Sequence, residues 1–264
     1  MLDAKKKRSH IIAVCGKGGV GKTSISAMIV KILSANPHHK VLAIDADPAV
    51  GLASALGITV HKTVDDIRND LIRQVKDGTS EDKAQLISKL DYEIFSALAE
   101  KINLAFLAIG RPEKEGCYCQ VNHMLKDLIV SLAGNFDYVV IDGEAGIEQV
   151  NRRVMENVTH LILVSDASAK GLNVAKTIKE IAESAILYEK YGLIVNRIRS
   201  LAEWNRIKIP PGLESIGWIP EDEIIRDCDI EARSILEIEN CPAIDALKNC
   251  LPRIGVTVSI QHAA

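Results

Sequence analysis

Apolar residues occur along the chain in short uninterrupted runs, separated by longer stretches in which they recur every three or four positions. The runs predict buried strands, because a strand covered by helices on both faces carries few polar residues. They span residues 10–15, 40–45, 103–110, 137–142, 160–165, 191–196 and 214–219. Helical periodicity is clearest in residues 22–35, 120–134 and 171–185. The alternation predicts one α/β domain over residues 1–264, with a mostly parallel twisted sheet of about seven or eight strands and helices on both faces.

One segment departs from this alternation. Residues 63–100 are rich in charged residues and helix formers and contain no apolar run of the strand type. They predict helices inserted between two strands, outside the sheet.

The composition limits which cellular compartment and which classes of binding partner are expected. The chain has 264 residues, of which 47% are hydrophobic and 25% charged, so a folded domain is expected rather than disorder. A net charge of -3 favours neither nucleic acid nor an anionic membrane as partner, and the basic run at residues 5–8 reads as a solvated lead-in. Without a long apolar run or a signal-peptide core, we expect a cytoplasmic protein whose six cysteines are not a disulfide framework.

The first apolar run ends in GKGGVGKT, residues 16–23, which fits the phosphate-loop pattern G-x-x-x-x-G-K-[ST]. A strand before it and a helix after it allow backbone N–H groups and the helix N-terminus to converge on phosphate oxygens. Lys22 is expected to reach the β and γ phosphates, and the Thr23 hydroxyl to bind Mg²⁺. The motif predicts a P-loop NTPase whose phosphate-binding residues are Gly16, Lys17, Gly18, Gly19, Val20, Gly21, Lys22, Thr23 and Ser24.

Carboxylates stand at two further strand ends. Asp45 and Asp47 follow the second run, and Asp142 closes the fourth as a Walker-B-like residue. Asp45 and Asp142 are expected to hold Mg²⁺ together with Thr23, directly or through water. A lone aspartate after a strand is usually a turn or cap residue, but three in one architecture favour the magnesium site.

The lysine directly after the first glycine, in KGGVGKT, resembles the deviant phosphate loop of a group of dimeric ATPases. That group includes the nitrogenase iron protein, septum-site and plasmid-partitioning ATPases, and metal-insertion accessory proteins. The resemblance implies a homodimer in which Lys17 crosses the two-fold interface and stabilises the transition state of ATP hydrolysis in trans. An exposed lysine at a loop tip is the alternative. The implied catalytic residues are Lys17, Lys22 and Asp47, with Asp47 orienting the attacking water.

The same resemblance assigns the adenine to two later stretches, LIVNR and GWIPED. The residues concerned are Asn196, Arg197, Ile219, Pro220 and Asp222. The amide of Asn196 can donate to and accept from a purine edge, although an Asx turn would also explain an asparagine there.

Two cysteines are separated by one residue in RPEKEGCYCQVNH, residues 111–123. In an extended segment Cys117 and Cys119 face the same way and could bind one ion, and the same pair from a two-fold partner would complete a four-thiolate site. By itself the pattern is more typical of structural or redox cysteines. His123 is a further candidate ligand, but it also falls at the start of an amphipathic helix. Of the other cysteines, Cys15, Cys241 and Cys250 are expected to be packing residues, whereas Cys228 is ambiguous.

GCYCQVNHML, followed by DGEAGIEQVNRR, resembles the CooC family, the nickel-insertion accessory ATPases of carbon monoxide dehydrogenase. The likeness extends from about residue 11 to 235 and assigns no role to the extreme C-terminus. It implies that Cys117 and Cys119 bind nickel or zinc at a homodimer interface in a nucleotide-dependent way, with ATP/ADP and Mg²⁺ as cofactors. The implied client is apo carbon monoxide dehydrogenase or acetyl-CoA synthase. Nickel and zinc both accept thiolates, so the sequence does not choose between them.

Two other functions are compatible with the phosphate loop. An iron–sulfur electron donor like the nitrogenase iron protein would need a cysteine just after the Walker-B strand, where this chain reads DGEAGIE. A partitioning or division ATPase would need a basic DNA-binding surface or a basic C-terminal amphipathic helix. The net charge of -3 and a short tail expected to be β-rich and weakly charged favour neither.

Overall fold

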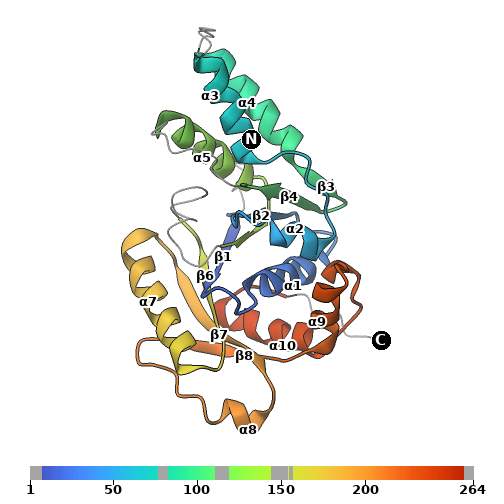
Figure 1. Ribbon diagram of the computed structural model, residues 1–264, viewed down its shortest axis with the longest axis vertical. Coiled ribbons are helices and arrows are strands. Elements are labelled where there is room, and N and C mark those ends of the chain that lie inside the picture. Colours follow the sequence, from blue (N-terminus) through green and yellow to red (C-terminus); the bar gives the residue numbers. More distant parts are fainter. Residues whose placement is uncertain (1–7, 77–82, 111–118, 144–153, 155–156, 259–264) are drawn as a thin grey trace, which may run out of the picture.

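The sheet in the computed structural model has the order β3-β4-β2-β5-β1-β6-β7-β8 within the described residues (Figure 1). The structure describes residues 8–76, 83–110, 119–143, 154 and 157–258. All neighbouring strands pair in parallel except β3, which runs antiparallel to β4. The strands are β1 His10–Gly16, β2 Val41–Asp45, β3 Ala99–Lys101, β4 Leu104–Ala108, β5 Tyr138–Asp142, β6 His160–Ser165, β7 Lys190–Ile198 and β8 Ser215–Pro220.

Helices cover both faces of this sheet. The helices are α1 Lys22–Ser34, α2 Gly51–Leu56, α3 Val64–Lys76, α4 Lys83–Ala97, α5 Cys119–Ala133, α7 Ala169–Ala185, α8 Leu201–Trp204, α9 Glu223–Ile230 and α10 Pro242–Cys250, with 3-10 turns η1 Ile235–Glu237 and η2 Leu251–Ile254. None of the helices in the described ranges has the length and apolar character that a membrane crossing requires.

Alternate side chains of each central strand belong to two separate hydrophobic cores, one on each face of the sheet. In β1, Ile12 and Val14 pack with residues of α1, α2 and α10, whereas Ala13 and Cys15 pack with residues of α3, α4, α5 and α7. The period of two follows from strand geometry, and burial on both faces explains why the strands contain so few polar residues. Each fully buried isoleucine, such as Ile12, contributes on the order of 2 kcal/mol of hydrophobic stabilisation.

The predicted fold class is confirmed, and all seven predicted strands are present. Residues 63–100 are mostly the helices α3 and α4, but the prediction was wrong at the end of the segment. Ala99 and Glu100 belong to β3, a three-residue edge strand. The short helix α2 was not predicted. The tail expected to be β-rich is helical through η2 and has no regular structure at residues 255–258.

Backbone hydrogen bonds continue across the sheet just beyond the carboxyl ends of four strands. They link β1, β5, β2 and β4 in order, through Gly143 N to Val14 O (3.0 Å), Ala46 N to Asp142 O (3.0 Å) and Ile109 N to Asp45 O (2.9 Å). The predicted carboxylates are therefore held at one edge of the sheet, next to the loop that follows β1.

Candidate functional site

The loop of residues 17–21 joins β1 to α1, and glycine is required at its last residue and at the residue before it begins. A Cβ on Gly16 would lie 2.2 Å from the carbonyl oxygen of Val164 on β6, so no side chain fits there. Gly21 has φ of 90°, which a residue with a side chain rarely adopts, and it directly precedes the first turn of α1. The N-terminus of α1 and the loop amides thus form a turn of a kind that can bind an anion.

Lys22 begins α1 and points back along the loop. Its side chain is buried, and Nζ donates a hydrogen bond to the carbonyl oxygen of Lys17 (3.3 Å). Lys17 itself is partly exposed. The ammonium group of Lys22 therefore lies against the loop backbone, whereas Lys17 is partly exposed.

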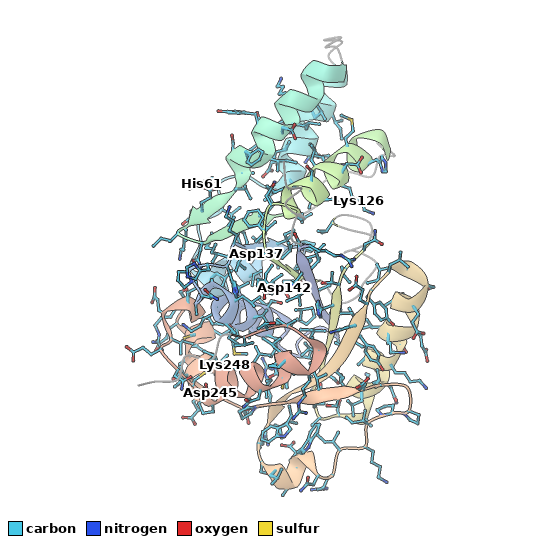
Figure 2. The ribbon with its side chains drawn as sticks, turned by 180° about the vertical axis from the view of Figure 1, so that it is seen from behind. His61, Lys126, Asp137, Asp142, Asp245 and Lys248 are labelled. Carbon is cyan, nitrogen blue, oxygen red and sulfur yellow. The ribbon has the colours of Figure 1, made fainter. Side chains whose placement is uncertain are left out.

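Asp142 ends β5 at the centre of the molecule (Figure 2) and is 1% exposed. Its oxygens accept hydrogen bonds from two hydroxyls of α1, Thr23 Oγ1 to Oδ2 at 2.7 Å and Ser26 Oγ to Oδ1 at 2.9 Å. Burial raises the pKa of Asp142 to about 6, while the two hydroxyls and Lys22 oppose that shift. A cation at this place would stabilise the carboxylate form.

Asp45 ends β2 and is the register partner of Asp142 on the neighbouring strand. It is fully buried, and its two oxygens accept the backbone N–H groups of Asp47 (3.0 Å) and Leu52 (2.8 Å). Burial, and next the charge of Asp142, raise the pKa of Asp45 to about 7. Asp45 thus anchors the start of α2 to the sheet, and an ion would reach it only by sharing these amide contacts.

Asp47 is half-buried and its Oδ1 accepts the N–H of Ala49 (2.9 Å). The segment between β2 and α2 therefore turns back at the same sheet edge as the loop. A carboxylate in this place can still turn toward a water molecule, because one short backbone contact holds it.

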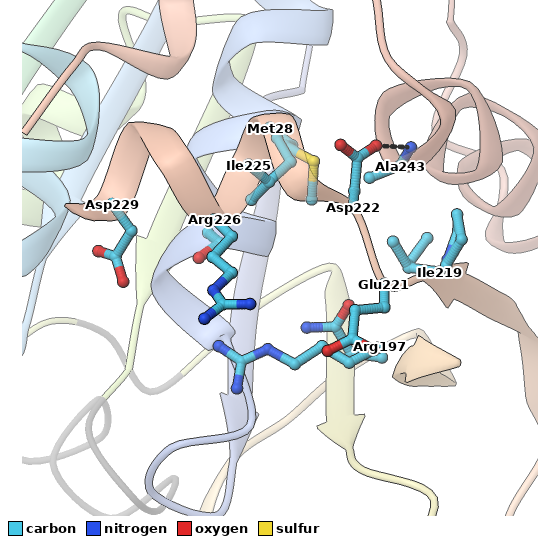
Figure 3. A pocket seen from close by; sticks show the side chains of 12 residues that line it. Met28, Arg197, Ile219, Glu221, Asp222, Ile225, Arg226, Asp229 and Ala243 are labelled. Atoms are coloured by element: carbon cyan, nitrogen blue, oxygen red, sulfur yellow. Dashed lines mark hydrogen bonds between the residues drawn. The ribbon is translucent and has the colours of Figure 1, made fainter. Parts of the chain in front are cut away.

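The residues predicted to hold a base come together around a cavity of about 230 Å³ (Figure 3). Asn196, Arg197, Ile219, Pro220 and Asp222 all line it, as does Ser24 from α1. The remaining lining residues were not predicted and are Met28, Glu221, Ile225, Arg226, Asp229 and Ala243. Apolar side chains beside polar and charged ones suit a flat aromatic ring carrying hydrogen-bonding groups.

Asp222 lines this cavity, but its carboxylate is engaged elsewhere. One oxygen accepts the N–H of Ile224 (3.0 Å) at the start of α9, and the other accepts the N–H of Ala243 (2.9 Å) at the start of α10. Asp222 therefore caps α9 and ties α10 to it. Asn196 is also engaged, because its Nδ2 donates to the carbonyl oxygen of Val20 (2.9 Å) in the phosphate loop.

Ser26 is a site residue that the sequence interpretation missed. It is fully buried and supplies the second hydroxyl to Asp142. The signal was available, because Ser26 stands three residues after Thr23 and so on the same face of α1.

The C-x-C pair is not tested by the geometry. Cys117 lies outside the described residues, and of Cys119 only the backbone is described. Cys119 is the first residue of α5, so the expectation of an extended segment was wrong at that position. On α5, His123 Nε2 lies 3.7 Å from Oδ2 of Asp127. Within the described ranges there is no group of three or more His, Cys, Asp or Glu residues that could hold a metal ion.

The four other cysteines are buried. Burial raises the pKa of Cys15 to about 12 and the pKa of Cys241 and Cys250 to about 11, and it also raises the pKa of Cys228. These groups are therefore neutral thiols at physiological pH and poor metal ligands.

The model of the AAA domain family matches residues 9–189 of the chain. An uncharacterised ATP-binding protein of Methanocaldococcus jannaschii is 39% identical over 227 residues, which cover 84% of this chain and 88% of that protein. The carbon monoxide dehydrogenase accessory protein CooC of Rhodospirillum rubrum is 32% identical over 263 residues, which cover 95% of this chain and 99% of that protein. The septum site-determining protein MinD of Thermotoga maritima is 28% identical over 226 residues, 81% of this chain and 76% of that protein.

Solved structures share the fold. The MinD of Pyrococcus horikoshii complexed with Mg-ADP superposes with a TM-score of 0.63 at 21% identity, covering 94% of this chain and 96% of that one. Apo McdA of Cyanothece superposes with a TM-score of 0.66 at 21% identity, covering 92% and 99%.

Proposed function

The chain belongs to the AAA domain family, within the P-loop ATPases of the MinD and ParA type. From this premise we propose that it is an ATP-dependent metal-delivery protein. Its homodimer binds Mg-ATP, hydrolyses ATP to ADP and phosphate, and uses this cycle to hold nickel or zinc and release it to an apoenzyme. The observation that carries the metal function is the 32% identity along 99% of a carbon monoxide dehydrogenase accessory protein. The C-x-C pair supplies suitable ligands.

The described side chains support the nucleotide half of this function. The hydroxyl of Thr23 donates a hydrogen bond to Asp142 and keeps lone pairs for a metal ion, so the donor set fits Mg²⁺. When bound, Mg²⁺ neutralises charge on the β and γ phosphates. Lys22 contacts the phosphates from inside the loop, and Asp47 orients the attacking water. Lys17, which is partly exposed, contacts the nucleotide of the partner subunit.

The metal half depends on two thiolates per chain. Two chains related by a two-fold axis bring four sulfurs together from Cys117 and Cys119, a donor set suited to zinc and nickel. The buried thiols elsewhere do not compete for the ion, because their raised pKa values keep them protonated. By analogy with the relative's name, the client is apo carbon monoxide dehydrogenase, with acetyl-CoA synthase as the second possibility.

The deciding experiment measures metal per chain after dialysis against nickel or zinc, with and without Mg-ATP. Wild type is compared with Cys117→Ser/Cys119→Ser, and the matched control is Cys228→Ser, which removes a buried thiol. We expect one ion per two chains in wild type and in the control, and none in the double variant. Metal that persists in the double variant, or no bound metal in any nucleotide state, would contradict metal delivery.

The likeness to the septum site-determining protein MinD favours a second candidate, a partitioning or division ATPase that binds a membrane or DNA. Sedimentation with anionic liposomes and mobility shift on duplex DNA, each with ATP and with ADP, test it. The net charge of -3 leads us to expect no ATP-dependent binding to either. Binding that requires ATP, in a protein that takes up no cysteine-bound metal, would replace metal delivery by this function.

A further inference from the structure

The end of β7 makes two side-chain contacts with the phosphate loop. Asn196 Nδ2 donates to the carbonyl oxygen of Val20 at 2.9 Å, and Arg197 Nη1 donates to the carbonyl oxygen of Gly19 at 3.2 Å. Asn196 is buried, with 6% of its surface exposed. Both residues also line the cavity described above, where Figure 3 labels Arg197. One strand end thus touches both halves of the candidate nucleotide site.

The backbone of β7 is irregular where these contacts are made. The β7–β8 register shifts between Val195 and Ile198, so Asn196 and Arg197 fall in a bulge, a feature that re-aims side chains. Arg197 has φ of 61°, an unfavourable left-handed conformation for arginine. On the loop side, a Cβ on Gly21 would lie 2.5 Å from Asn196 Nδ2. Strand and loop are each adapted to this approach.

The contacts determine which way the loop's peptide groups point. A trans peptide directs its C=O and N–H in opposite directions. Donors from β7 hold the carbonyls of Gly19 and Val20 on the strand side, so the N–H groups of the next residues, Val20 and Gly21, are directed away from β7. N–H groups turned into the loop attract phosphate oxygens, whereas carbonyls would repel them.

We infer that Asn196 and Arg197 are positioning residues that hold the phosphate loop in its anion-binding shape before any base is bound. This role differs from a base contact, because it sets the affinity for the phosphate chain itself. It rests on the proposed binding of ATP at this loop. Because the two side chains contact the loop and line the base cavity, they also link occupancy of the cavity to the geometry of the loop.

A ligand without a base separates the two roles. Calorimetric titration with Mg-tripolyphosphate and with Mg-ATP compares wild type, Asn196→Ala and Arg206→Ala. Asn196→Ala removes a donor without changing charge, and Arg206 is an exposed arginine past α8 that serves as the control. We expect Asn196→Ala to weaken both ligands by a similar factor of about five to ten, as loss of one buried hydrogen bond predicts, and Arg206→Ala to change neither.

Two outcomes overturn the inference. Weaker ATP binding with unchanged tripolyphosphate binding would make Asn196 a base contact only, and no change in either would leave it without a role at the loop.

Thermal unfolding without ligand checks the fold. If Asn196→Ala does not fold, Arg197→Gln takes its place, compared with Arg197→Ala. The glutamine keeps an N–H donor but no charge, so better tripolyphosphate binding by Gln than by Ala indicates the hydrogen bond, and equal loss contradicts it. A wild type that binds neither ligand refutes the nucleotide site itself.

Discussion

Among single side chains, the carboxylate of Asp142 depends most closely on its neighbours. It is buried beside Asp45, another buried carboxylate, and its own oxygens are satisfied by two hydroxyls from one helix. Burial alone would favour the protonated form, and the hydroxyls of Thr23 and Ser26 lower that cost. Ser26 thereby supports the carboxylate that we propose as a magnesium ligand, without having to touch the ion itself.

Replacing Ser26 with alanine should lower the free energy of unfolding of the nucleotide-free protein by about 1–2 kcal/mol, because a buried carboxylate oxygen loses its donor. It should also weaken Mg²⁺ binding, since the pKa of Asp142 rises further. Urea unfolding and Mg²⁺-dependent ATP binding measure the two effects. Ser34→Ala is the control, because that hydroxyl donates only to a carbonyl within its own helix. Equal free energies of unfolding for the two variants would show that the hydroxyl of Ser26 does not stabilise the buried carboxylate.

A second buried group, His160, lies at the opposite edge of the sheet, at the start of β6. Its Nδ1 is 2.7 Å from Thr159 Oγ1, and the ring of His10 is 5.6 Å away. Burial lowers the pKa of His160 to about 4, and the charge of His10 acts in the same direction; Lys190 also lowers it, and Glu189 and the backbone of Ile254 oppose.

This lowered pKa makes stability depend on acid. Between pH 6.5 and 4, His160 is protonated in the unfolded chain but neutral in the folded chain. The free energy of unfolding therefore falls as the pH falls through this range. We expect the loss to be on the order of 2 kcal/mol for this group and to be absent from His160→Gln. Urea unfolding of both proteins across that range measures it. Parallel pH profiles would place the acid sensitivity elsewhere.

Among the elements, α9 and α10 share a single capping residue. The carboxylate of Asp222 accepts one amide from the first turn of each helix, Ile224 N in α9 and Ala243 N in α10. Because α10 packs on β8 and α1, this residue connects the wall of the base cavity to the core.

Asp222→Ala should therefore destabilise the nucleotide-free protein by about 1–3 kcal/mol, the effect of losing helix caps at two termini. Thermal and urea unfolding test it, with Ser200→Ala, which removes the exposed cap of the short helix α8, as the control. A variant as stable as wild type that binds ATP more weakly would instead mean that the carboxylate serves the nucleotide directly.

The elements also show how far sequence reasoning extends. Continuous apolar runs identified every long strand, because burial on both faces leaves a strong pattern. The three residues of β3 carry no such pattern, since an edge strand this short is defined only by its pairing with β4. Asn196 and Asp222 were both expected to contact a base. Their bonds to Val20 and Ala243 depend on segments distant in sequence, which a motif cannot reveal.

For the whole molecule, the proposal requires two chains in each active unit. Lys17→Ala and Asp47→Ala should each abolish hydrolysis, yet an equal mixture should regain about a quarter of wild-type activity. Random exchange makes half of the dimers mixed, and each mixed dimer contains one site with its own Asp47 and a Lys17 from the partner. Steady-state phosphate release measures this. A mixture as inactive as its components would mean that Lys17 acts within its own chain, and an active Lys17→Ala would mean that Lys17 has no role in hydrolysis.

The backbone bonds that continue past the strand ends bear on hydrogen exchange. The amides of Ala46, Ile109 and Gly143 lie outside the strands, yet each donates to the neighbouring strand end. They should exchange as slowly as the central sheet, because they open only when it does. Asp45 and Asp142 thus belong to one cooperative unit. In the sequence this unit extends to Ile109, eight residues before Cys117, the first cysteine of the C-x-C pair. Faster exchange at these three amides on adding ATP would mean that nucleotide binding loosens the hydrogen bonds of the sheet. Unchanged slow exchange would mean that any conformational change on ATP binding occurs outside the sheet.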